Sequence, residues 1–97
     1  MYEINNTLRN SSFDGLTVKV LSKTETCETL LITLEKGALF PEHTSPRDAL
    51  LVMLEGTIVF SISAKDYLIE EYQSFTFPAL EKHHVIAEEN TKFLIIR

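Results

Sequence analysis

The chain has 97 residues, so we expect a single domain that spans residues 1–97. Nine Lys and Arg residues against 14 Asp and Glu residues give a formal net charge of −5, which argues against a nucleic-acid-binding surface. Hydrophobic residues make up 44% and charged residues 24%, and this balance excludes a disordered chain.

Other features of the sequence predict where in the cell the protein is found. No apolar run approaches the ~18 residues of a membrane span, and the first six residues do not resemble a secretory signal. The lone Cys27 cannot form an internal disulfide, which fits a reducing compartment. We therefore expect a cytoplasmic protein that binds neither a membrane nor nucleic acid.

Short β-type segments dominate the chain from Leu16 onward, after a short irregular N-terminal segment in which residues 3–12 allow one helical turn. Polar turns separate these segments, and Pro78 ends one of them because it lacks an amide donor. The pattern predicts an all-β sandwich or barrel. The expected strands are 17–21, 29–34, 49–54, 57–63, 67–70, 75–77, 83–87 and 92–96.

Histidines gather near strand ends in two stretches, and these stretches resemble the two motifs of the cupin superfamily. The first motif, at about residues 37–56, has Gly37, His43 and Gly56 in register. The second, at about residues 72–87, has Pro78 and His83 in register. The resemblance covers residues 30 to 96 and implies an antiparallel double-stranded β-barrel of the jelly-roll type, with its site inside the barrel.

The resemblance also implies a divalent metal held by three histidines and a glutamate, but two of these positions have changed. Ser45 stands at the second histidine position and Ala49 at the glutamate position. Asp48 is the candidate substitute ligand, although strand alternation turns it outward unless a bulge or loop intervenes. We therefore expect a depleted site of His43 and His83, which leaves a Zn, Fe, Mn or Ni ion short of the usual three protein ligands.

Two further positions of the second motif, which are glycine in the family, are Tyr72 and Leu80 here. A bulky residue at positive φ is costly, so the turns have either changed shape or retain local strain. We expect the change of shape.

Three functions compete. The first is a small-molecule-binding cupin whose pocket contains His43, Ser45, Met53 and His83, with a reduced metal site and no assignable reaction. The alternative is a metal-dependent enzyme of the isomerase or dioxygenase type, with Asp48 beside the two histidines. The third is an interaction role as a homodimer, which we expect in any case. The sequence does not decide whether the protein is an enzyme, and it names no ligand and no required cofactor.

Each histidine also has a reading without a metal. His43 serves equally well at a strand end, hydrogen-bonded to a backbone carbonyl. His83 can be a polar group that contacts a ligand inside the barrel. His84 should point away from His83, because neighbouring side chains alternate along a strand.

Overall fold

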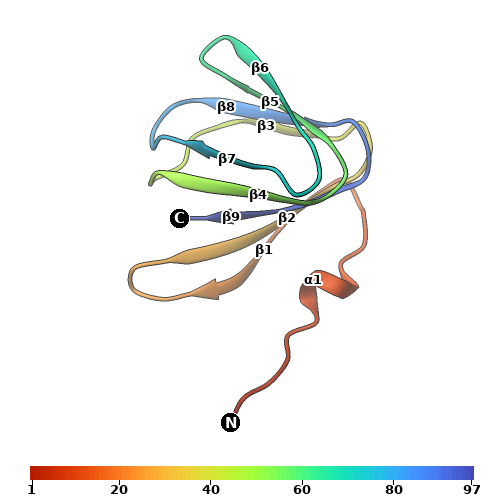
Figure 1. The fold of residues 1–97 in the computed structure, drawn as a ribbon, viewed down its shortest axis with the longest axis vertical. Helices are drawn as coiled ribbons and strands as arrows, with labels where there is room; N and C mark the ends of the chain where they lie inside the picture. The colour runs from red at the N-terminus through yellow and green to blue at the C-terminus, as the bar shows by residue number, and fades with distance from the viewer.

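Two antiparallel sheets face each other in the computed structural model, which describes residues 1–97 (Figure 1). The five-stranded sheet has the order β1-β2-β9-β4-β7, and the four-stranded sheet has the order β3-β8-β5-β6. The elements are α1 (Thr7–Asn10), β1 (Leu16–Lys23), β2 (Glu28–Leu34), β3 (Leu39–His43), β4 (Ala49–Glu55), β5 (Ile58–Ile62), β6 (Lys65–Ile69), β7 (Ser74–Phe77), β8 (His83–Ala87) and β9 (Thr91–Ile96).

Strand alternation builds the core between the sheets. In β4, Ala49, Leu51 and Met53 are buried, and the residues between them are more exposed. Phe60 of β5 meets them from the other sheet and is almost fully buried. Every second residue therefore faces the interior, as the period of two in an extended strand requires.

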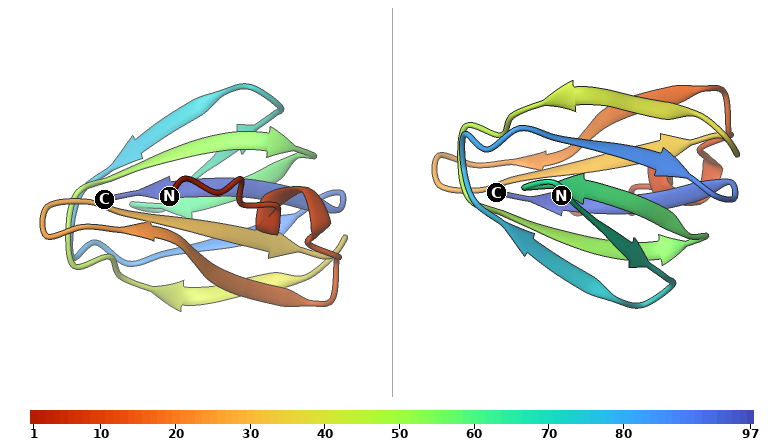
Figure 2. Two further views of the ribbon diagram at one scale, coloured as in Figure 1. Left: turned by 90° about the horizontal axis from the view of Figure 1, so that it is seen from below. Right: turned by 90° about the horizontal axis from the view of Figure 1, so that it is seen from above.

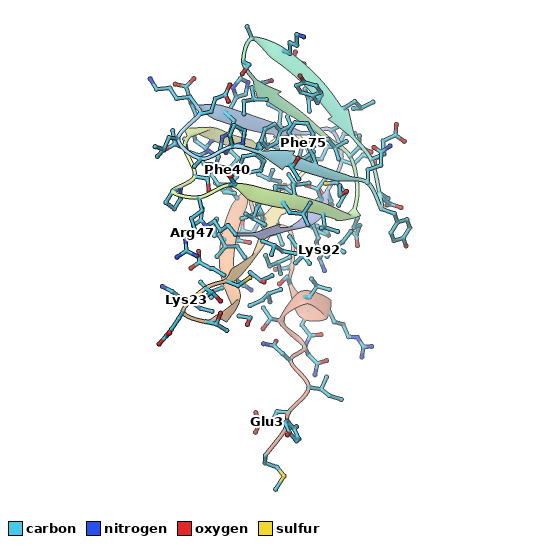
Figure 3. The ribbon with its side chains drawn as sticks, turned by 60° about the vertical axis from the view of Figure 1, so that its left-hand side comes forward. Glu3, Lys23, Phe40, Arg47, Phe75 and Lys92 are labelled. Carbon is cyan, nitrogen blue, oxygen red and sulfur yellow. The ribbon has the colours of Figure 1, made fainter.

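The N-terminal segment contains only the single turn α1 and lies against the outer face of the five-stranded sheet (Figure 2). The Lys92 ammonium donates a hydrogen bond to the Leu8 carbonyl at 3.0 Å, and it lies 5.4 Å from the centroid of the Phe13 ring. Before α1 the chain extends away from the sheets, and Glu3 marks this extension (Figure 3). No helix is long and apolar enough to cross a membrane.

All eight predicted strands are present, and the structure adds one, β3, that the sequence pattern did not indicate. This strand contains Pro41 and Glu42, and its register against β8 shifts between Phe40 and His43. Proline is tolerated there because β3 is an edge strand with an irregular ladder. The bulge also interrupts the alternation by which the other strands were predicted.

The strand pairing gives the two facing antiparallel sheets that the resemblance to a jelly-roll β-barrel implied, without ladders that close them into a barrel. Hydrogen-bonded ladders run within each sheet, and none joins β1 to β3 or β6 to β7. Both views in Figure 2 show β1 and β3 on the same side of the molecule. The sandwich therefore has an open seam between β1 and β3, which matters for the site below.

The expected change of shape at the two glycine positions is wrong. Tyr72 and Leu80 both have a φ of 65°, in the left-handed region that favours glycine. The turns have therefore kept the backbone conformation and lost the residue that adopts it without cost. Both side chains are solvent-exposed, at 87% for Tyr72 and 75% for Leu80, so neither gains compensating burial.

The homodimer stays a prediction. A homodimer formed through sheet faces would need apolar side chains on an outer face. The outer face of the five-stranded sheet has them in adjacent positions, because Leu31 pairs with Leu94 and Leu94 pairs with Val52. Leu31 is fully buried, whereas Leu94 and Val52 are partly accessible.

Replacing Tyr72 or Leu80 with glycine should stabilise the protein by about 0.5–1 kcal/mol each, because relief of left-handed strain exceeds glycine's added unfolded-state entropy. The free energy of unfolding in urea measures this change. Gly56→Ala is the control of opposite sign, since Gly56 has a φ of 83° and an added Cβ would collide with the Asn90 carbonyl oxygen. Destabilisation by both Tyr72→Gly and Leu80→Gly would contradict the strain argument.

Candidate functional site

A cavity of about 220 Å³ lies between the two sheets and extends to the seam between β1 and β3. Its wall is mostly apolar, and its polar groups come from β3, β8, the chain after β3 and the end of β9. Val18 of β1 lines the cavity and is 49% exposed, so it stands at the entrance. The lining residues are Val18, Leu30, Ile32, Phe40, His43, Thr44, Ser45, Phe77, His83, Val85, Phe93, Ile95 and Arg97.

His43 and His83 face each other across the β3–β8 ladder, where they are paired in register. Their ring centroids are 4.2 Å apart, and the ring planes meet at 67°. Phe40 stacks on His43 at 3.9 Å, and Phe60 stacks on His83 at 5.1 Å. The structure therefore brings both predicted histidines together and restricts the orientation of each ring by packing.

In each ring, a backbone carbonyl two residues earlier in the chain fixes a proton on one particular nitrogen. Nδ1 of His43 lies 2.7 Å from the Pro41 oxygen, and Nδ1 of His83 lies 2.9 Å from the Glu81 oxygen. A carbonyl can only accept a hydrogen bond, so Nδ1 carries the proton in both rings. Nε2 is then the unprotonated acceptor of each neutral imidazole, and no protein donor contacts either Nε2.

Burial favours the neutral form of His83 in particular, since only 3% of this residue is exposed. Desolvation lowers its pKa below the ordinary value, and the neighbouring His43 acts in the same direction. The hydrogen bond to the Glu81 carbonyl opposes this shift without reversing it. His83 is therefore an uncharged hydrogen-bond acceptor near neutral pH.

Ser45 and Arg97 complete the polar end of the cavity. The buried Ser45 hydroxyl donates to the Arg47 carbonyl at 2.6 Å and accepts from Nη1 of Arg97 at 3.4 Å. Nε of Arg97 donates to the Glu28 carboxylate at 3.0 Å. The polar end of this mostly apolar cavity therefore contains one cationic group, the Arg97 guanidinium.

Two residues predicted for the site lie elsewhere. Met53 is fully buried in the core but is not part of the cavity wall. Asp48 is exposed, and its Oδ1 accepts a hydrogen bond from the Ala79 amide at 2.8 Å. It borders a separate hollow on the outside of the five-stranded sheet. The outward orientation that strand alternation predicts for Asp48 is the one observed, and it removes the substitute ligand from the histidines.

Arg97 is the site residue that sequence reasoning missed. Phe93 and Ile95 of β9 point inward, and the same period of two places Arg97 on that inner face. The alternation therefore contained the signal, although position 97 lies beyond both family motifs.

The residues around the histidines do not fit the divalent metal that the family resemblance implies. No group of three or more His, Cys, Asp or Glu side chains could hold an ion. The Ser45 hydroxyl is engaged with Arg47, and the alanine at the glutamate position offers no donor atom. The Arg97 guanidinium also lines the cavity and would repel a cation. Two imidazoles without a carboxylate are fewer ligands than such metals take from proteins.

Comparison with known proteins places these features in context. A protein-family model described as a cupin domain matches residues 30–97. No curated protein matches the chain.

Solved structures share the fold at low sequence identity. An RmlC-like cupin protein from Desulfovibrio desulfuricans superposes with a TM-score of 0.85 at 20% identity, covering 99% of this chain and 95% of that one. A conserved protein of unknown function from Streptococcus pyogenes gives 0.83 at 21% identity, covering 99% and 86%. KdgF from Halomonas sp. gives 0.77 at 17% identity, covering 84% and 76%.

The lowered pKa of His83 predicts a pH-dependent stability. The unfolded chain takes up a proton on this imidazole at a higher pH than the folded chain does. The free energy of unfolding should therefore be highest above about pH 6.5 and fall as the pH drops through that value. Urea unfolding at about pH 7.5 and about pH 5.5 measures the difference. The difference should shrink in His83→Phe and persist in His84→Gln, and an unchanged difference in His83→Phe would contradict the assignment.

The incomplete ligand set predicts that the purified protein holds well below one equivalent of Zn, Fe, Mn or Ni when each is supplied, as measured by elemental mass spectrometry. Restoring the family's residue types with Ser45→His and Ala49→Glu together should produce stoichiometric binding. Ser45→Ala with Ala49→Gln is the matched control that supplies no charged or imidazole ligand. Stoichiometric metal in the unchanged protein, lost in His83→Ala, would contradict this prediction.

Proposed function

Because the chain belongs to the cupin family, we propose that it binds a small organic molecule in the cavity between its two sheets. One observation carries the proposal: an apolar cavity has two adjacent imidazoles at its polar end, with their Nε2 atoms free of protein donors. Apolar walls with a few convergent polar groups are the usual composition of a ligand site.

The apolar wall and the polar end of the cavity would contact different parts of a ligand. Leu30, Ile32 and Phe93 supply apolar surface, whose removal from water drives binding with little directional preference. Nε2 of His43 and of His83 would accept hydrogen bonds and so orient a ligand that carries a hydroxyl or an N–H group. A ligand without such a donor would leave a buried acceptor unpaired, which costs affinity.

The size of the cavity limits the ligand. Its volume of about 220 Å³ lies below the ~300–1,000 Å³ of sites that hold drug-sized molecules. The ligand is therefore expected to be a compact metabolite. The metal-dependent alternative has no comparable support, since the residues lack a third ligand and include a competing guanidinium.

Blocking the entrance tests this function directly. The probes are small alcohols, amides and carboxylic acids of roughly six to ten non-hydrogen atoms. A probe present at about ten times its Kd should stabilise the protein by about 1.4 kcal/mol and raise Tm by about 6–11 °C. Val18→Trp should abolish this shift, because residue 18 lines the cavity at its entrance. Differential scanning fluorimetry measures it.

Val20→Trp is the matched control. Val20 lies on the same strand and the same face, is 58% exposed and does not line the cavity, so its variant should keep the full shift. Shifts of equal size in the two variants would show that the probes bind elsewhere and would refute the proposed site.

A further inference from the structure

The charge of the cavity is opposite to that of the chain. The protein carries 14 Asp and Glu residues, yet none of the 13 residues that line the cavity is acidic. Arg97 is the one permanently charged side chain in the lining. The Arg97 side chain is 23% exposed, and this partial burial strengthens its attraction for an anion beyond that of a fully solvated cation, although Glu28 already contacts its Nε. The lining therefore favours an anionic ligand over a neutral or a cationic one.

The surface beside the cavity extends this asymmetry. A hollow of about 170 Å³ adjoins the cavity at Arg97, and Lys23 and Arg47 also line it. Glu25 and Glu28 are the acidic residues of that hollow, so cations outnumber anions there by one. Figure 3 shows Lys23 and Arg47 on the same side of the molecule. In a chain of net charge −5, this local excess would draw anions toward Arg97.

Arg97 retains capacity to bind a carboxylate. Its Nε is engaged by Glu28, and its Nη1 makes a long contact of 3.4 Å with Ser45. Nη2 makes no hydrogen bond within the protein. A guanidinium has five N–H donors in a planar arrangement, so donors remain for a second carboxylate.

The two imidazoles specify a second polar group of the ligand. With Nδ1 donating to a backbone carbonyl, Nε2 is the acceptor atom of a neutral ring, and an acceptor does not bind a carboxylate oxygen well. A hydroxyl group satisfies an Nε2 atom by donating its hydrogen. The cavity thus combines a cation, a pair of acceptors and an apolar wall within one small volume.

We propose that the ligand is a small hydroxycarboxylic acid with an apolar chain, whose carboxylate binds Arg97 and whose hydroxyl donates to Nε2 of His83 or His43. This inference rests on the proposed function, because it identifies the chemical class bound in the same cavity. Binding requires no covalent step.

Four probes with one carbon skeleton test the class: 4-methylpentanoate, 2-hydroxy-4-methylpentanoate, 4-methylpentanamide and 4-methylpentan-1-ol. Isothermal titration calorimetry on the full chain gives the Kd of each. The acid should bind at least about tenfold more tightly than the amide or the alcohol, because its bonds to Arg97 are charge-assisted. The hydroxy acid should bind about three- to tenfold more tightly than the acid.

Arg97→Met and Glu28→Gln should change the affinity for the acids in opposite directions, which a general loss of folding would not do. Arg97→Met should weaken both acids by more than about tenfold and leave the amide and the alcohol unchanged. Glu28→Gln removes the carboxylate that competes for Arg97, so it should strengthen binding of the acids about threefold. The advantage of the hydroxy acid over the acid should be lost in His83→Phe or in His43→Phe, according to which imidazole accepts the hydroxyl, and an advantage kept in both variants would contradict the hydroxyl contact. Arg47→Gln is the control, because Arg47 does not line the cavity and the Kd should change less than in Arg97→Met.

The outcomes distinguish this inference from the proposed function. Equal affinity for acid, amide and alcohol, unchanged in Arg97→Met but lost in Val18→Trp, would refute the hydroxy-acid class and leave the cavity as a binding site. Binding of none of the four probes at millimolar concentration would overturn both. Tighter binding of the acids in Arg97→Met would also overturn the inference.

Discussion

Two backbone carbonyls, those of Pro41 and Glu81, each accept a hydrogen bond from the Nδ1–H group of a histidine two residues later. These contacts determine what the cavity offers a ligand, because they place the proton of each ring on the nitrogen that faces the backbone. The β3–β8 register then brings the two rings together, and stacked phenyl rings hold them there. The same arrangement would suit a metal, since a ligating histidine commonly donates its other N–H to a carbonyl.

The difference between a metal site and an organic-ligand site therefore depends on the residues around the pair. An ion of charge +2 needs further ligands, and carboxylates also offset its charge. Here the two relevant positions are Ser45 and Ala49, and a guanidinium lines the same cavity. Few substitutions therefore separate a cavity with two histidines from one whose residues complete a metal site. Similarity at about 20% identity shows the fold alone, so the identity of these residues has to be taken from the site itself.

Much of the fold was predictable because its determinants are local: alternating apolar residues, polar turns and a proline that ends a strand. The exception, β3, has a register shift between Phe40 and His43 that breaks the alternation. The pairing of His43 with His83 was reachable through the family motifs, whereas Arg97 required alternation to be extended past β9. The strain at Tyr72 and Leu80 was harder to predict, because a missing glycine is equally compatible with a different turn.

The open seam of the sandwich has a consequence for solubility. Unpaired edge strands expose amide and carbonyl groups that can template the addition of a strand from another molecule, which leads to aggregation. Both edges at the seam carry features that oppose this addition. In β3, Pro41 lacks an amide hydrogen and the ladder is bulged, and in β1 the register shifts between Val20 and Ser22. Lysines 19 and 23 add charge along β1. The entrance to the cavity can thus remain open to solvent without making the protein prone to edge-to-edge assembly.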